Sequence, residues 1–393
     1  MYNSDIDDIV YLDNNATTPL APEVLEAMLP FLRDDFGNPS SIHRLGRRAK
    51  DALSRSRRAV AELIGAGPDE IVFTAGGTEA DNLAILGTAG AAKTGERRHL
   101  VASNIEHHAV FQMLGHLEQH GWEVTIVDVN ERGRLAPERL FKALRPDTLL
   151  VSIMYANNET GVLQPIRELA SAAHDVGALF HTDAVQACGK IPVDVGTLGV
   201  DLLSLSAHKF YGPNGVGALY VRDGVACEAM FLGGGQERAR RAGTENLPGI
   251  VGLAEACRQV QIRLESESKK LARLRDELQS NVVERIPGSQ VNGSGVERTP
   301  NTVNFRFESV DGHDLVMALD AAGFAVSTGA ACDTGGTGSH VLAGMGLNPE
   351  AVRGSVRVSL GRYTLERDIG VFSEALANAV ETVRAKSNFT KAR

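Results

Sequence analysis

Short apolar runs alternate with longer segments of helical spacing from about Glu70 to Val221. Segments such as "TEADNLAILGTAGAA" and "PIRELASAAHDVG" repeat their apolar residues every three or four positions, which indicates amphipathic helices. Apolar strands that alternate with helices predict a mostly parallel sheet that is covered on both faces. The runs that read as strands are Glu70–Thr74, His99–Ser103, Glu123–Val129, Thr148–Met154, Ala178–Asp183, Asp201–Ser206 and Gly215–Val221.

The amino-acid composition of the chain changes near Gly233. The run "GGGQERARRAGTEN" is rich in glycine and basic residues and predicts a long loop. A long helical pattern follows from Gly249 to about Arg285, then strands at "TVNFRF" and "SVRVSL" and a final helix from about Leu365 to Val383. We therefore predict an α/β protein with two domains. The large α/β domain comprises residues 15–250, and the smaller α+β domain comprises residues 1–14 and 251–393.

Composition limits the classes of function. The 393 residues suffice for two domains, and a content of 43% hydrophobic and 23% charged residues is typical of a soluble globular enzyme. The net charge of −9 argues against nucleic acid or an anionic membrane as the main partner. No apolar run approaches the roughly 20 residues that span a bilayer. The arginine-rich stretches within residues 44–60 are typical of the solvated polar face of a helix.

The first residues and the cysteines bear on the cellular compartment. The acidic start "MYNSDIDDIVYLD" lacks the basic and apolar regions of a signal peptide. Cys188, Cys227, Cys257 and Cys332 lie far apart and form no CxxC pair, so neither a zinc site nor a disulfide framework is indicated. These features predict a reducing, cytoplasmic compartment.

Polar side chains follow successive predicted strands, at the edge where a parallel α/β sheet binds ligands. In "FTAGGTEADNLAI" two glycines lead from a strand into a helix whose first turn contains Thr78. Free N–H groups and a hydroxyl at such a helix start form an anion site. The alternative is a plain helix cap, in which Thr78 and Asp81 form a variant capping box. The spacing matches neither a dinucleotide fingerprint nor a P-loop.

An acid and a lysine end two further strands. In "FHTDAVQACGK", Asp183 closes an apolar strand and Gln186 lies just beyond, and the alternative role of Asp183 is to cap the next helix. In "LLSLSAHKFYGPNGVG", Ser206, His208 and Lys209 come directly after a strand. Because desolvation lowers the pKa of a lysine, Lys209 is predicted to be a nucleophilic amine.

Together these features fit one cofactor, pyridoxal 5′-phosphate (PLP). PLP requires a phosphate cradle, a carboxylate at its ring nitrogen and a lysine for a Schiff base. An aromatic side chain must also lie on the ring face, and "SNIEHHAV" supplies a histidine at another strand end. We expect only one of His107 and His108 to face the cofactor, and the other to be an exposed helix residue.

At these residues the chain resembles the cysteine desulfurases, the NifS/IscS-like branch of the class V PLP-dependent aminotransferases. The matching motifs keep the family's order from Tyr11 to Thr364. The resemblance implies the PLP-dependent transferase fold type I, with a mostly parallel seven-stranded sheet in the large domain. The motifs are "YLDNNATTP", "FGNPSSIH", "FTAGGTEADNLAI", "EHHAV", "YANNETG", "HTDAVQACGK", "SLSAHKFYGP", "GGGQERARRAGTEN", "GAAC", "SHVLAGMG" and "VRVSLGRYT".

The resemblance implies a role for each residue around the cofactor ring. It implies that Lys209 forms the internal aldimine, that Asp183 pairs with the pyridinium nitrogen, and that Gln186 hydrogen-bonds the ring oxygen. His107 stacks on the ring and is a candidate acid–base group. Asn158 lies near the ring substituent and the substrate.

The phosphate residues implied by the resemblance come from two subunits. Gly77, Thr78, Ser206 and His208 bind the phosphate within one subunit. Thr244, in "RRAGTEN", reaches the phosphate of the neighbouring subunit. The resemblance therefore also implies a homodimer.

For the substrate, L-cysteine, the resemblance implies that Arg357 clamps the carboxylate as a bidentate pair, with Asn38 and Asn158 nearby. Cys332 stands at the position of the family's nucleophilic cysteine, on a mobile loop at about 327–340. It takes the substrate sulfur, which leaves L-alanine and a persulfide on Cys332. The sulfur then passes to an iron–sulfur scaffold or another sulfur-acceptor protein, for cluster assembly or thio-modification.

The loop departs from the family's pattern around Cys332. The run "TGAACDTGGTGSHV" is one residue shorter between the cysteine and "SHV" than the family's long-loop form, and Asp333 lies beside the nucleophile. A close carboxylate raises the pKa of a thiol and slows its attack. Alternatively, Asp333 points to water, or it helps Cys332 to hold iron or an iron–sulfur cluster transiently.

Two other functions stay open on the sequence. One is a related PLP lyase or aminotransferase, such as a selenocysteine lyase, which does not need Cys332. The other is a weakly active sulfur-relay or scaffold protein. The intact set of Lys209, Asp183, His107 and Cys332 favours the desulfurase.

Overall fold

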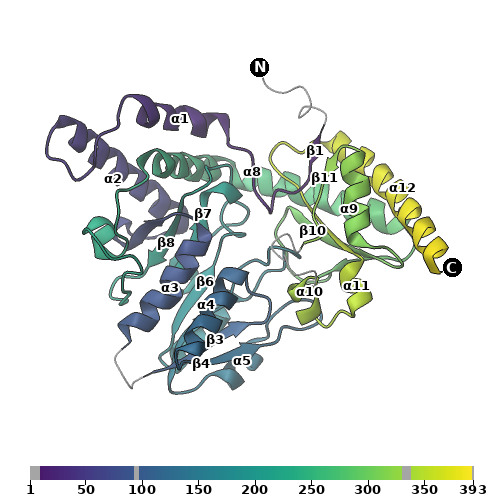
Figure 1. Cartoon of the computed structure of the whole chain (residues 1–393), viewed down its shortest axis with the longest axis horizontal. Helices are drawn as coiled ribbons and strands as arrows, with labels where there is room; N and C mark the ends of the chain where they lie inside the picture. Colours follow the sequence, from purple (N-terminus) through teal and green to yellow (C-terminus); the bar gives the residue numbers. More distant parts are fainter. Residues whose placement is uncertain (1–8, 93–96, 330–337, 392–393) are drawn as a thin grey trace.

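The computed structural model describes residues 9–92, 97–329 and 338–391, and its main feature is a seven-stranded sheet (Figure 1). The strands follow the order β2-β8-β7-β6-β5-β3-β4. Only β8 runs antiparallel to its neighbours, so the predicted mostly parallel sheet is confirmed. The strands are β2 (Ile71–Thr74), β3 (His99–Ser103), β4 (Glu123–Val127), β5 (Thr148–Ser152), β6 (Leu179–Asp183), β7 (Leu202–Ser206) and β8 (Gly217–Val221).

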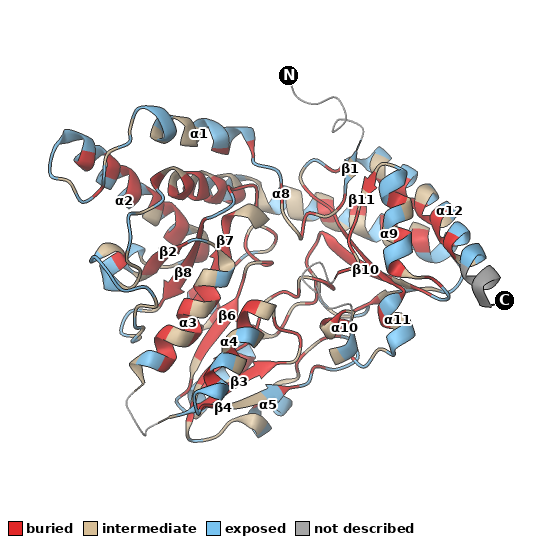
Figure 2. Ribbon diagram, viewed as in Figure 1, coloured by how far each residue is buried: buried red, intermediate tan, exposed pale blue. Residues whose placement is uncertain are grey.

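Helices cover both faces of this sheet because its strands are apolar on both faces. On one face, Val72 and Leu100 pack with α3 (Gly77–Ala91) and α4 (His108–Gln119). Their chain neighbours Phe73 and Val101 point to the opposite face, where α2 (Arg44–Ile64), α5 (Pro137–Ala143) and α6 (Ile166–Asp175) contribute to the core. Figure 2 shows most strands of this sheet as buried, beneath helices whose outer sides are exposed; the edge strand β4 is partly exposed.

A second core lies around a smaller antiparallel sheet. Its central strand β10 (Thr302–Phe307) pairs with β9 (Ser289–Asn292) and β12 (Ser355–Ser359), and α9 (Gly312–Ala321) and α12 (Glu366–Lys391) pack beside it. Leu12, which follows the short parallel pair of β1 (Val10–Tyr11) and β11 (Phe324–Ala325), belongs to this core. The N-terminal segment therefore packs with the C-terminal part of the chain in this second core.

One long helix belongs to both cores. Helix α8 (Leu247–Arg285) contributes Leu253 and Cys257 to the core of the large sheet, and Leu274 and Leu278 to the second core (Figure 1). The division at residue 250 stays a prediction. The remaining elements are α1 (Pro22–Arg33), α7 (Val195–Leu198), α10 (His340–Gly344), α11 (Pro349–Arg353), η1 (Pro68–Glu70), η2 (Ala207–Lys209) and η3 (Gln236–Ala239).

The arginine-rich residues form α2, as expected, but not all of them are solvated. Arg57 is half-buried and donates to both carboxylate oxygens of Glu237, at 2.8 and 2.5 Å, and to the Ile71 carbonyl. The prediction of a purely solvated face was wrong for Arg57, because the loop that carries Glu237 folds back over this helix.

Two remaining expectations concern helices and cysteines. Among the described helices, none is long and apolar enough to cross a membrane. Cys188 and Cys257 are buried and Cys227 is half-buried, and none of these three is in a disulfide. Burial raises the pKa of Cys227 to about 11, so these thiols are packed and unreactive near neutral pH.

Candidate active site

A cavity of about 360 Å³ lies at the carboxyl ends of the central strands, where residues of the second core close over the sheet edge. This is the place where parallel α/β sheets bind ligands. Its lining contains most of the predicted site residues: Gly77, Thr78, His107, Asn158, Asp183, Gln186, Ser206, His208, Lys209 and Arg357.

The amine of Lys209 is held in the cavity by the N-terminal segment. Lys209 is the last residue of η2, directly after β7, and its Nζ donates to the carbonyls of Asn15 and Ala16 at 2.7 and 2.8 Å. Thr18 bonds the neighbouring His208 carbonyl through both its N–H and its hydroxyl, at 2.9 Å each. These contacts place a nucleophilic amine at a defined point of the lining.

A second lysine lies behind the first. Lys190 is buried, and its Nζ donates to Asn15 Oδ1 at 3.0 Å and to Gln186 Oε1. Burial, followed by the charges of Lys209 and Arg357, lowers the pKa of Lys190 well below its ordinary range. Gln186 in turn donates from Nε2 to the Asn15 carbonyl at 2.9 Å, so Asn15 organises this side of the cavity.

Asp183 ends β6 and is buried in the cavity wall. Its Oδ1 accepts the Val185 N–H at 2.8 Å, but the residues that follow form turns, so the alternative of a helix cap was wrong. Burial raises the pKa of Asp183, whereas His107 and Lys209 act in the opposite direction. The carboxylate is therefore placed to face a cationic group in the cavity.

His107 and His108 both line the cavity, and neither is exposed, so the expectation of an exposed helix residue was wrong; which of the two faces the cofactor stays a prediction. His107 is the extended residue before α4 and His108 is the first residue of that helix, so the backbone turns between the two side chains. Burial lowers the pKa of His107, and its Nδ1 accepts the Ala109 N–H at 3.1 Å. The neutral ring therefore carries its proton on Nε2. His108 packs on His340, with ring centroids 4.8 Å apart.

The start of α3 has the features of a phosphate site. Its cap residue, Gly76, makes no side-chain cap bond, so the first N–H groups of the helix stay available to a ligand. A Cβ at Gly77 would come within 2.7 Å of Val185 Cγ2, which leaves little room for any other residue there. Burial and nearby lysines lower the pKa of His208 to about 4, so His208 acts as a neutral hydrogen-bonding group. The capping-box alternative was wrong, because Asp81 is buried and lines the cavity.

Arg357 is placed to bind an anion at the opposite wall. It lies on β12 and is only 2% exposed; Nη2 pairs with Asp13 Oδ1 at 2.6 Å and Nη1 donates to the Asn158 carbonyl at 3.0 Å. Its buried Nε has no hydrogen-bond partner within the described part of the chain. An unpaired buried donor is costly, which favours a carboxylate ligand at this point.

Three predicted residues are not part of the described lining. Asn38 and Thr244 are exposed and do not line the cavity of their own chain. Cys332, with Asp333 and the proposed metal role, lies outside the described residues. Within the described residues, no cluster of three or more His, Cys, Asp or Glu side chains could hold a metal ion.

Several lining residues were missed by sequence reasoning. Glu159 comes from the same "YANNETG" motif as Asn158, and His340 from "SHVLAGMG", so the motifs contained a signal for both. Asn15 and Ala16 belong to "YLDNNATTP", but nothing in that run indicates that it reaches Lys209. The missed residues are Asn15, Ala16, Asp81, His108, Met154, Glu159, Val185, Gly329 and His340.

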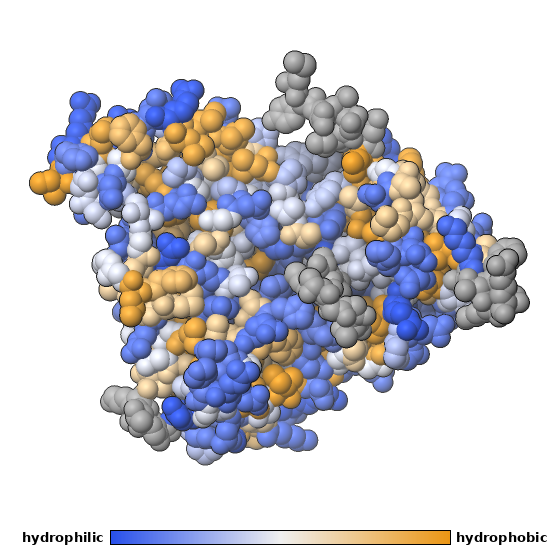
Figure 3. Space-filling view, viewed as in Figure 1, coloured by the Kyte–Doolittle hydropathy of each residue, from blue (hydrophilic) through white to orange (hydrophobic). Residues whose placement is uncertain are grey.

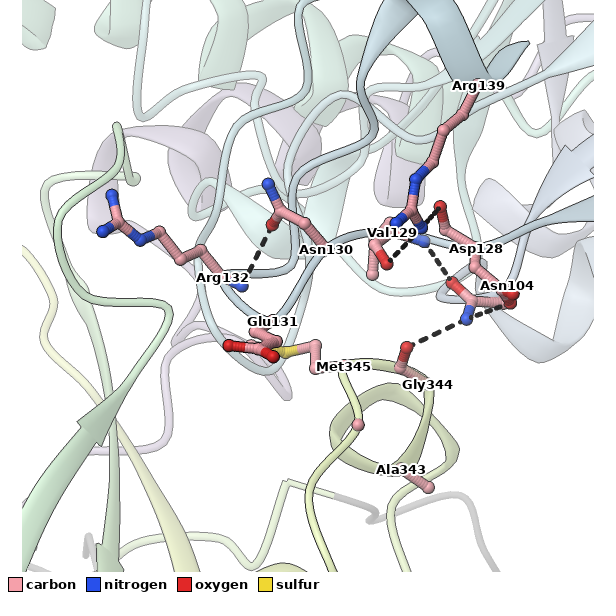
Figure 4. A pocket seen from close by; sticks show the side chains of 11 residues that line it. Asn104, Asp128, Val129, Asn130, Glu131, Arg132, Arg139, Ala343, Gly344 and Met345 are labelled. Carbon is pink, nitrogen blue, oxygen red and sulfur yellow. Dashed lines mark hydrogen bonds between the residues drawn. The ribbon is translucent and has the colours of Figure 1, made fainter. Parts of the chain in front are cut away.

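A second hollow, of about 640 Å³, lies where α10 meets the segments after β3 and β4 (Figure 4). There Asn104 Nδ2 donates to the Gly344 carbonyl at 3.0 Å and to Asp128 Oδ1 at 2.9 Å. At the other end of α10, His340 Nε2 lies 2.9 Å from the Glu106 carbonyl. The second hollow contains none of the predicted site residues, so the cavity at the strand ends is the candidate active site.

The cavity fits a phosphate-bearing aldehyde cofactor such as PLP. Lys209 offers an amine to the aldehyde, Asp183 offers a carboxylate to a protonated ring nitrogen, and the uncapped start of α3 offers N–H groups to the phosphate. The Nε of Arg357, which has no hydrogen-bond partner within the described residues, also favours a polar ligand in this lining.

Comparison with known proteins agrees with this geometry. The Aminotransferase class-V family matches residues 10–372. The chain is 47% identical to cysteine desulfurase IscS of Dictyoglomus turgidum, over 97% of this chain and 96% of that protein. A solved NifS-like protein superposes with a TM-score of 0.90 at 37% identity, covering 95% of this chain and 100% of that one. A structure described as SspA in complex with cysteine superposes with a TM-score of 0.80 at 36% identity, covering 90% of this chain and 99% of that one.

The chain therefore belongs to the class-V aminotransferase family, whose members are PLP-dependent enzymes of fold type I. Within that family it groups with the cysteine desulfurases. The predicted fold class, family and cofactor are confirmed.

Proposed function

We propose that this protein is a PLP-dependent cysteine desulfurase that converts L-cysteine to L-alanine and transfers the sulfur to Cys332. The observation that carries the proposal is the meeting of three side chains in one cavity: Asp183 at the end of β6, Lys209 just after β7, and Arg357 on β12. When bound, the cofactor withdraws electrons from the substrate α-carbon. The relative whose printed description includes cysteine supports the choice of substrate.

The chain's own residues bind and orient the substrate. The Nε–H of Arg357, which has no hydrogen-bond partner in the described part of the chain, is placed to receive the substrate carboxylate. Asp183 keeps a negative charge near Lys209 and His107, which favours a protonated ring nitrogen. The neutral His107 presents Nε2–H as a hydrogen-bond donor, since Nδ1 is occupied by the Ala109 N–H.

In the sulfur transfer the carbon–sulfur bond of L-cysteine breaks and a sulfur–sulfur bond to Cys332 Sγ forms. One proton ends on the carbon, which gives L-alanine, and one on the outer sulfur of the persulfide. An unperturbed thiol is only a few per cent ionised at neutral pH, so Cys332 must lose its proton to a nearby base before it attacks. The atoms and electrons of L-cysteine and the Cys332 thiol equal those of L-alanine and the persulfide. The step therefore needs no added oxidant or reductant.

We also propose a homodimer in which Thr244 completes the phosphate site of the partner. A hollow of about 500 Å³ shares Thr78, Ser206 and His208 with the cavity and is bordered by Phe231. Phe231 is 47% exposed and the adjacent Leu232 is 90% exposed, so two apolar side chains lie next to this hollow.

A second apolar region adds to the surface available to a partner subunit. Figure 3 shows apolar patches over α1 and the start of α2. Phe36, between these helices, is 74% exposed, and Ile42 is 90% exposed. Replacing Leu232 by Asp is expected to shift the protein toward monomer in sedimentation experiments, and an unchanged dimer would argue against this surface.

The sulfur acceptor is proposed to be an iron–sulfur scaffold or another sulfur-acceptor protein. The support is the IscS name of a relative at 47% identity. The cytoplasmic location predicted from the sequence stays a proposal of the same kind.

The test is mass spectrometry and product analysis after L-cysteine is added to the purified, PLP-loaded protein. We expect L-alanine in an amount equal to the sulfur released, and one added sulfur atom on Cys332. The Cys332→Ala variant should keep the cofactor and lose the persulfide. If that variant still desulfurates L-cysteine at the original rate, the protein is a lyase that does not use this thiol.

A further inference from the structure

The side chain of Glu159 meets the chain on both sides of residues 330–337, the segment that contains Cys332. After the segment, Ser339 Oγ donates a hydrogen bond to Glu159 Oε2 at 2.5 Å. Before it, Gly329 packs so closely that a Cβ there would lie 2.8 Å from the same oxygen. The φ of Gly329 is +91°, which also favours glycine at this position. One carboxylate oxygen therefore contacts both flanks of the segment.

Glu159 is itself a fixed part of the cavity wall. Its side chain lines the cavity, and the residue is only 2% exposed. Its N–H donates to Asn157 Oδ1 at 2.9 Å, and its carbonyl accepts from Asn304 Nδ2 at 3.3 Å. Because the backbone of Glu159 is held on both sides, its carboxylate is a defined anchor point for the flanks.

The two flanks rest on different parts of the fold. The flank before the segment belongs to the second core, where Ser327 exchanges backbone hydrogen bonds with Arg357 of β12, at 3.2 and 2.7 Å. Ser327 Oγ also accepts the Gly329 N–H at 3.1 Å. The flank after the segment is the start of α10, a helix that is bonded to the loop after β3 of the large sheet (Figure 4). The shared carboxylate thus joins a flank on the second core to a flank on the large sheet.

The hydroxyl of Ser339 has two partners. Ser339 is the N-cap of α10, and its Oγ accepts the Leu342 N–H at 3.0 Å. A hydroxyl has one proton to donate, and here that proton goes to Glu159. The cap and the bond to Glu159 can therefore be tested separately.

We propose that Glu159 is a positioning residue for the sulfur transfer. Its carboxylate ties Gly329 and Ser339 to the cavity wall, so that the segment between them begins and ends beside the substrate site. Fixing the ends of a chain close to a site raises the effective concentration of a group that the chain carries. Loss of the tie should therefore slow the step that uses Cys332 and leave the binding of cofactor and substrate in place. The inference rests on the proposed function, because it requires sulfur transfer to Cys332.

The experiment compares Ser339→Ala with Ser339→Thr in the PLP-loaded protein. Alanine removes the hydroxyl that bonds Glu159, whereas threonine keeps it. After rapid mixing with L-cysteine, mass spectrometry of quenched samples gives the rate at which Cys332 gains sulfur. We expect alanine to lower this rate at least about tenfold, as for the loss of a hydrogen bond to a charged group, and threonine to restore it to within about threefold. PLP affinity and KM for L-cysteine should change by less than about threefold in both variants.

Two further variants separate the tie from the helix cap. Asn348→Ala removes the side-chain cap of the neighbouring helix α11 and is the control, with an expected rate within about threefold of the original. Glu159→Leu removes the acceptor of the tie. Alone or combined with Ser339→Ala, it should slow sulfur transfer to about the same extent as Ser339→Ala, because residues that act through one contact do not add. If Glu159→Leu does not fold, the comparison of the two Ser339 variants decides alone.

Three results would overturn the proposal. If Ser339→Ala slows sulfur transfer no more than Asn348→Ala does, the bond to Glu159 has no role in it. If PLP affinity or KM worsens in proportion to the rate, Glu159 supports the cavity and not the segment. If the losses from Ser339→Ala and Glu159→Leu multiply, the two residues act independently. Absence of the persulfide on Cys332 in the original protein would instead reject the proposed function, and this inference with it.

Discussion

The cavity, with the buried residues behind its lining, has an acidic wall and a basic wall. The pKa values of buried groups are shifted upward on the acidic wall and downward on the basic wall. On one wall burial raises the pKa of Asp81, Asp183 and Glu106, and the charge of Asp183 adds to this for Asp81 and Glu106. On the other wall burial, followed by the charges of Lys209 and Arg357, lowers the pKa of Lys190. Burial thus favours the neutral form on both walls, for acids on one and for an amine on the other.

The difference between the walls lies in what supports them. Asp183 and Glu106 follow the strands of the large sheet, and backbone N–H groups of Val185 and Met154 bond them. The basic wall is assembled from distant segments, and Asn15 links it by accepting from both Lys190 and Lys209. The acidic wall is thus part of the sheet, whereas the basic wall also depends on the N-terminal segment, through Asn15, and on β12, through Arg357.

The largest expected effect comes from the amine that the basic wall presents to the cavity. Lys209→Ala should lower turnover of L-cysteine at least about 1000-fold, because no other amine is held at that point by two carbonyls. The measurement is alanine formation together with visible absorption of the PLP-loaded protein. The buried neighbour provides the control: Lys190→Met should keep the visible band. Equal losses in both variants would mean that the two lysines act as one structural unit.

The next effect concerns the anion site of the basic wall. Arg357→Lys keeps the charge but loses the planar fork that holds Asp13 and the Asn158 carbonyl. We expect KM for L-cysteine to rise roughly 10- to 100-fold, as for the loss of one charged hydrogen bond, with a smaller change in kcat. Steady-state kinetics measure this split. A fall in kcat at constant KM would place Arg357 outside substrate binding.

The acidic wall predicts a pH-dependent stability. The pKa of Glu106 is about 8 in the folded chain and near 4.3 when unfolded, so the unfolded state releases a proton that the folded state retains. The free energy of unfolding should therefore fall by at most about 1.4 kcal/mol per pH unit from this group as pH rises from about 5 to 8. Glu106→Gln should remove that slope in urea titrations of the PLP-free protein. A variant with the same slope would mean that Glu106 is ionised when folded.

The smallest effect is the matching slope from the basic wall. Because the pKa of Lys190 is lowered in the folded chain, the unfolded chain binds more protons between the folded and the unfolded pKa, and stability rises as pH approaches about 10. Lys190→Met should flatten this rise by at most about 1.4 kcal/mol per pH unit. The same urea titrations, extended to alkaline pH, measure it, with exposed Lys142→Met as the control. If both variants behave alike, Lys190 stays charged inside the protein.

The two walls also explain how far sequence reasoning reached. Strand ends are visible in the apolar pattern, and they predicted Asp183, Ser206, His208 and Lys209 at one edge of the sheet. The pattern does not give the direction of a helix face, so Asp81 was taken for a cap although it is buried beside the cavity. It likewise gives no distance between segments far apart in the chain. For that reason it missed the contact of Asn15 with Lys209, 194 residues away.

The most direct test of the account asks which lysine carries the cofactor. The purified protein is loaded with PLP, treated with borohydride to fix the link, and digested for peptide mapping. The account predicts the added mass on the peptide that contains Lys209, and none on the peptide that contains Lys190. Attachment at Lys190, or no attachment at any lysine, would contradict it.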